Sequence, residues 1–191
     1  MDIRLSWDLF VIVFFIVIVA YSFIIGRNST LKVIVGTYIS ALAADAIGNL
    51  FGQYFSGSAF FLKLLKLAAV NNEDQAVIFA KVTVFVLLVI LFAVKGAFSV
   101  QTTDDRSPSI RLVMSMVYAF LSAGLIISAM LVFVSGVSFI GGSSPETTTT
   151  ALWDVYNKSS LIRSMVQNSY LWFSAPAVAF LLHSLYSEKD E

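Results

Sequence analysis

Long apolar runs separated by shorter polar segments form the main pattern of this sequence. A helix rises about 1.5 Å per residue, so about 20 apolar residues cross the roughly 30 Å hydrocarbon core of a bilayer. Four runs approach or exceed that length. We therefore predict four membrane-spanning helices, at about residues 9–25, 31–55, 76–94 and 112–134.

The remaining segments are shorter or mixed in character. Residues 60–67 combine Phe and Leu with two lysines, which is typical of a short interfacial helix. Residues 136–150 are rich in Gly, Ser and Thr and predict a flexible loop. Residues 151–191 mix aromatic and charged side chains, which predicts an amphipathic, membrane-associated segment with an interfacial helix at about 152–173. Pro176 should end that helix, leaving an apolar stretch at 177–186 that is too short to span.

The predicted fold class is therefore all-α: an integral membrane four-helix bundle over residues 1–135, followed by a C-terminal amphipathic, interfacial helix. Composition agrees with lipid as the solvent, because 58% of the 191 residues are hydrophobic and only 13% are charged. Twelve basic residues balance twelve acidic ones, so we expect no nucleic-acid partner. The expected partners are the bilayer and either further copies of the chain or other membrane proteins.

Nothing in the sequence forms a catalytic or metal-binding constellation. There is no Cys, and His183 is the only His, so no second His or Cys ligand exists to complete a metal site with it. The acidic residues follow no recognisable enzyme motif. We therefore expect no enzymatic activity, no metal and no cofactor.

Small residues recur at every fourth position of the second apolar run. On a helix this spacing makes one groove, and such grooves let helices approach closely in membranes. A shorter ladder in the fourth run is a plausible mate, and the second helix should be the most interior one. The groove serves either packing within one chain or contact between copies. The two ladders consist of Gly36, Ser40, Ala44, Gly48 and Gly52, and of Ser115, Ala119 and Ala123.

A polar stripe of Asp45, Asn49 and Gln53 runs beside the first ladder. A carboxylate near the centre of a spanning helix costs about 2.5–3.5 kcal/mol on the insertion scale, so either something offsets its charge or the group stays protonated. Asp45 is either part of a path for protons or solutes, or a structural group hydrogen-bonded to Asn49 and to neighbouring helices.

Lys81, near the start of the third run, is a possible ion-pair partner for Asp45. If these two helices are antiparallel, the axial offset between the residues is only about 4–5 Å at the helical rise. A lysine near a helix end more often extends alone to the interface, and this second interpretation is the favoured one.

Basic residues set the expected orientation. Arg27 and Lys32 follow the first span, and Lys95, Arg106 and Arg111 follow the third. The excess of positive charge in cytoplasmic loops would place both of these loops inside the cell and both termini outside. Two lysines in the second loop, Lys63 and Lys66, work against this assignment.

The chain resembles the colicin V production (CvpA) family of bacterial inner-membrane proteins. The resemblance rests on Trp7-Asp8-Leu9 before the first span, Gly26-Arg27 in the turn after it, and the second span rich in small residues. It implies a four-span, non-enzymatic protein of the bacterial inner membrane that acts in toxin production or export, or in envelope homeostasis. The fourth span departs from the family pattern, because Ser115, Ala119 and Ala123 stand where the family has a glycine ladder with an arginine nearby.

The alternative function is a small channel or transporter subunit. In that case Asp45, Asn49 and Gln53 would line a polar path, with several copies of the chain surrounding it.

Overall fold

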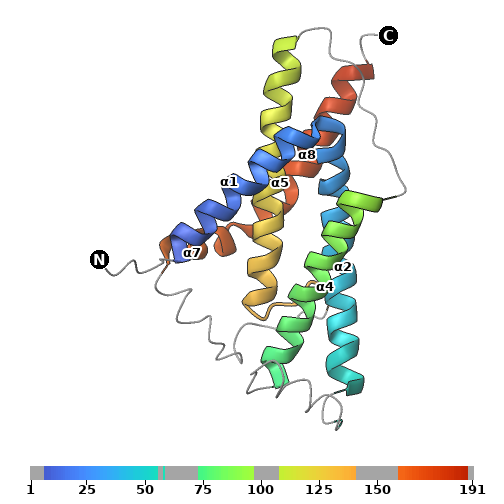
Figure 1. The fold of residues 1–191 in the computed structure, drawn as a ribbon, viewed down its shortest axis with the longest axis vertical. Coiled ribbons are helices and arrows are strands. Elements are labelled where there is room, and N and C mark those ends of the chain that lie inside the picture. Colours follow the sequence, from blue (N-terminus) through green and yellow to red (C-terminus); the bar gives the residue numbers. More distant parts are fainter. Residues whose placement is uncertain (1–6, 56–57, 59–72, 97–107, 141–158, 189–191) are drawn as a thin grey trace.

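The computed structural model describes residues 7–55, 58, 73–96, 108–140 and 159–188, which form helices and short turns (Figure 1). Four helices in this part of the chain are long and apolar enough to cross a membrane. The predicted all-α membrane bundle is thus confirmed. The described helices are α1 (Trp7–Ile25), α2 (Arg27–Phe55), α4 (Glu73–Lys95), α5 (Pro108–Val134), α7 (Ser160–Gln167) and α8 (Ser169–Glu188).

A single residue joins α1 to α2, and for this reason α2 begins earlier than its apolar run. Gly26 has φ +81°, a left-handed conformation that costs glycine little. The Thr30 hydroxyl donates to the carbonyls of Ser22 at 3.0 Å and Gly26 at 2.9 Å. The same two carbonyls accept backbone N–H groups, from Gly26 at 3.2 Å and from Thr30 at 2.9 Å, so the hydroxyl adds a second bond to each at the turn.

The most interior helix is α5, and the prediction that α2 holds this place is wrong. α5 contacts α1, α2, α4, α7 and α8. Within their spanning segments, 61% of α5 is buried against 50% of α2. The physical reason is that α2 keeps one apolar face outward, including Ile39, Leu42, Ile47 and Leu50.

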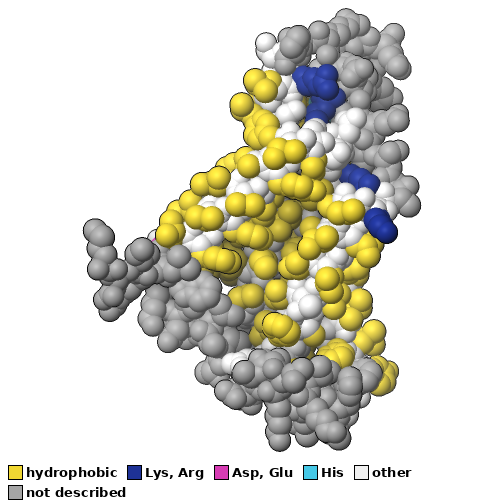
Figure 2. Space-filling model, in the orientation of Figure 1, with side chains coloured by type: hydrophobic (Ala, Val, Ile, Leu, Met, Phe, Trp, Pro, Cys, Tyr) yellow, Lys and Arg dark blue, Asp and Glu magenta, His cyan; other side chains and the backbone are white. Residues whose placement is uncertain are grey.

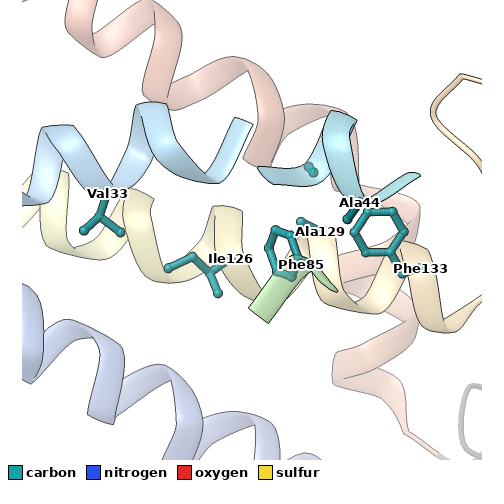
Figure 3. Close-up of a cluster of buried hydrophobic side chains, with 7 residues drawn as sticks. Val33, Ala44, Phe85, Ile126, Ala129 and Phe133 are labelled. Carbon is teal, nitrogen blue, oxygen red and sulfur yellow. The ribbon is translucent and has the colours of Figure 1, made fainter. Parts of the chain in front are cut away.

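Part of the core lies where α2, α4 and α5 meet (Figure 3). Ala44 of α2 belongs to the same buried cluster as Phe85 of α4 and Phe133 of α5. The two rings meet edge to face, with their centroids 5.5 Å apart. This arrangement is the one that aromatic quadrupoles prefer, so the cluster fixes α4 and α5 relative to each other.

The C-terminal helix differs from its prediction at Pro176, because α8 continues through this proline. Pro176 is buried, and nearby the Tyr38 hydroxyl of α2 donates to the Phe173 carbonyl at 2.5 Å. Such contacts with neighbouring helices allow a membrane helix to keep an interior proline. The predicted single helix at 152–173 instead breaks at Asn168, between α7 and α8.

α8 runs antiparallel to α5 and ends near the beginning of α5 (Figure 1). The Trp172 side chain lies against Gly124. Further along α8 the His183 ring packs on the Tyr118 ring, with the ring centroids 6.0 Å apart. α1 begins beside α7, away from the end of α8 (Figure 1). The expectation that both termini lie outside the cell stays a prediction. The predicted interfacial helix at 60–67 and most of the predicted loop at 136–150 lie outside the described residues.

Candidate functional site

The carboxylate of Asp45 is completely buried in α2 and is the acceptor at the centre of a polar cluster. Lys81 Nζ lies 2.6 Å from its Oδ1. Its Oδ2 accepts from the Ser138 hydroxyl and from the Ile140 backbone N–H, each at 2.8 Å. One turn further along α2, Asn49 donates to the Ser138 hydroxyl oxygen at 3.1 Å. We refer to these five residues as the Asp45 cluster.

Gly48 makes room for the lysine that reaches Asp45. A Cβ atom on Gly48 would lie only 2.2 Å from Lys81 Cγ, so the aliphatic stem of the lysine crosses α2 at the glycine. The Lys81 side chain is thereby covered, and the residue is 5% exposed. The predicted position of Lys81 at the interface is therefore wrong, and the ion pair is what the structure shows.

The three glycines of the first small-residue ladder all face α4. Gly36 lies against Phe92, and Gly52 lies against Val77, as Gly48 does against Lys81. The expected mating of this ladder with the one in the fourth span is not seen at these positions. In that second ladder Ala119 and Ala123 are buried, whereas half-buried Ser115 donates to the Arg111 carbonyl at 2.8 Å. Ser40 and Ala44 of the first ladder are also buried.

A turn after α5 brings Ser138 and Ile140 to Asp45. Gly136 has φ +80°, which lets the chain reverse directly after the helix. The Phe139 ring then packs edge to face on Phe133, with centroids 5.3 Å apart, and on Phe173, with centroids 5.1 Å apart. These aromatic contacts hold residues 135–140 against the bundle, so that their polar groups meet the carboxylate.

The structure divides the predicted polar stripe. Asp45 and Asn49 join the cluster, whereas Gln53 is exposed one turn beyond and makes no contact with it that the structure defines. Sequence reasoning missed Ser138 and Ile140. They lie 93 and 95 residues from Asp45 in a glycine-rich segment, and no periodic signal connects positions so far apart.

The electrostatics of the cluster are those of a buried, hydrogen-bonded ion pair. Removing two charges from water is costly, and the cost is offset only where the geometry is good and the remaining lone pairs find donors. Both oxygens of Asp45 have donors, which meets that condition. The arrangement can hold α2, α4 and residues 135–140 together.

A second polar contact joins α1 to α7. The Ser159 hydroxyl donates to the carboxylate of Asp8, and the same oxygen accepts from the Ile162 N–H at 3.0 Å as the N-cap of α7. Among the described residues, no three His, Cys, Asp or Glu side chains could together hold a metal ion. His183 packs on Tyr118 and is 9% exposed.

The chain matches no family model, no curated protein and no solved structure.

Proposed function

We propose that this chain is a non-enzymatic multi-pass membrane protein that acts as the resemblance to the colicin V production family implies. Its role would be in toxin production or export, or in envelope homeostasis. Asp8, which carries part of that resemblance, contacts Ser159 at the start of α7. The aspartate that the family resemblance places before the first span thus connects α1 to the start of α7 in this chain.

The observation that carries a structural role is the closure of the Asp45 cluster. A channel lining must expose its polar groups to water, but Asp45 is 0% exposed and both of its oxygens have donors. An ionised group at this depth needs partners, and the partners of Asp45 all lie within one chain. This supports a scaffold over an open path.

The bacterial inner membrane is the proposed location. Four described basic residues gather at the end where α1 meets α2, where α4 ends and where α5 begins, and Figure 2 shows Lys and Arg side chains near that end. Under the positive-inside rule this end would be cytoplasmic. These four residues are Arg27, Lys32, Lys95 and Arg111.

Complementation tests the proposed role. The chain is expressed in a colicin V-producing bacterium that lacks its own colicin V production protein, and the secreted toxin is titrated. We expect the chain to restore secretion, and the control is an inactive membrane protein of similar size expressed to the same level. Full membrane insertion without any restored secretion would contradict the proposal.

A transporter or channel subunit is the second candidate, because Asp45 and Lys81 are ionisable groups inside spanning helices. The test is ion or proton flux into liposomes that contain the purified chain. A flux that Asp45→Asn abolishes, while the bundle stays folded, would favour this candidate over the scaffold. Liposomes that stay as tight as empty ones would remove it.

A further inference from the structure

An apolar groove of about 710 Å³ lies between α1, α5, α7 and α8. Phe15 of α1, Phe120 of α5 and Trp172 of α8 are among its walls. The Phe120 ring contacts both of the others, with centroids 5.1 Å from Phe15 and 5.6 Å from Trp172. The groove is therefore built on packed aromatic side chains.

The groove continues along α1. A second hollow of about 470 Å³ shares Phe120 and Leu121 with the first and reaches Phe23. From Ile12 to Phe23 the path follows eleven steps of one helix, which is about 17 Å at the helical rise. One leaflet of a bilayer contributes about 15 Å of hydrocarbon, so the groove has the length of an acyl chain.

Among the residues that line the two hollows, the polar ones lie at one end. Ser164 and Asn168 line the groove where α7 meets it. α7 turns Ile162 and Met165 into the bundle, so its outward side is the polar one. Asp8 also lies at this end, where its carboxylate accepts from Ser159.

We propose that this groove binds one glycerophospholipid from the surrounding bilayer, with an acyl chain along α1 and its headgroup beside Ser164 and Asn168. The groove is continuous with a lipid-facing surface, because Ile12 and Ile16 line it and are themselves exposed. A hydroxyl and a side-chain amide can donate hydrogen bonds to phosphate oxygens. An empty apolar groove would forgo dispersion contacts that an acyl chain supplies.

Fluorescence of Trp172 tests the proposal, because this side chain lines the groove. Trp7→Phe and Trp153→Phe leave it as the only tryptophan. In detergent, phosphatidylglycerol with a brominated acyl chain is added at low mole fraction. We expect quenching that saturates at about one lipid per chain.

Two variants of α8 form the matched pair. Ala175→Phe places a ring in the groove, and Val178→Phe places the same ring on an exposed position outside it. We expect Ala175→Phe to abolish the saturable quenching and Val178→Phe to keep it.

Three results would overturn the proposal: quenching that rises linearly without saturation, saturable quenching that survives Ala175→Phe, or a groove occupied by a second copy of the chain in native mass spectrometry. Thermal unfolding and gel filtration check that each variant folds, and Ala175→Leu replaces Ala175→Phe if the larger ring prevents folding. The result is independent of the complementation test, because that test reads toxin secretion.

Discussion

The ammonium of Lys81 on α4 lies 2.6 Å from the carboxylate of Asp45 on α2, and both side chains are buried within the bundle. The glycine ladder of α2 makes this contact possible, because Gly48 leaves space for the lysine stem. Gly48 and Asp45, a packing residue and a charged residue of the same helix, thus both contribute to the contact between α2 and α4.

Breaking this pair from one side should cost more than removing it completely. Asp45→Asn leaves an unpaired buried ammonium, and we expect a loss of about 3–5 kcal/mol in the free energy of unfolding. Adding Lys81→Met, which keeps the aliphatic stem, should recover part of that loss. Thermal unfolding of both single variants and the double variant in detergent measures the coupling. Additive losses would show that the two side chains do not interact.

Alanine substitutions along the ladder should differ in a defined order. A Cβ atom would lie 2.2 Å from Lys81 Cγ at Gly48, 2.8 Å from Phe92 Cβ at Gly36 and 3.1 Å from Val77 Cγ2 at Gly52. We expect Gly48→Ala to be the most destabilising and Gly52→Ala the least, within the roughly 1–3 kcal/mol typical of overpacking. Chemical unfolding in mixed micelles measures the order, and equal losses at the three positions would contradict the packing described for α2 and α4.

The turn at Gly136 should matter through the Asp45 cluster. Gly136→Ala forces a left-handed alanine, which costs about 1–2 kcal/mol, and should displace Ser138 from Asp45. The matched control is Gly26→Ala, which has a similar φ but no atom within 4 Å of the new Cβ. Each glycine variant is then combined with Ser138→Ala, and thermal unfolding gives the loss of stability. We expect the losses to be non-additive for Gly136→Ala and additive for Gly26→Ala. If both pairs are equally additive, the turn at Gly136 does not act through the Asp45 cluster.

The contact between α1 and α7 should depend on one hydroxyl. Ser159→Ala removes the N-cap of α7 and the bond to Asp8, and N-cap losses typically cost about 1 kcal/mol. We expect faster hydrogen exchange across α7 and little change in α2. Ser160→Ala is the control, since this neighbouring serine is exposed. Unchanged exchange in α7 would show that the cap does not hold the helix.

The sequence predicted the spans well because apolar length is a local property, and each span could be recognised from its own residues. It also placed Asp45 and Lys81 at similar depths. It favoured the wrong position for Lys81, because the covering of its stem by Gly48 depends on how two helices pack. Ser138, Ile140 and the continuity of α8 through Pro176 depend on contacts between distant segments, and a local pattern does not report those.

The ladder of α2 packs within one chain in this structure, and a disulfide between Gly52→Cys and Val77→Cys tests that claim most directly. The chain has no native Cys, and a Cβ on residue 52 would lie 3.1 Å from a Val77 side-chain carbon, which is close enough for a bridge. Leu50→Cys with Val77→Cys is the control, since Leu50 faces outward. After mild oxidation in membranes, we predict a bridge within single chains for the first pair only. Bridges that form only between chains, or no bridge at all, would contradict the account.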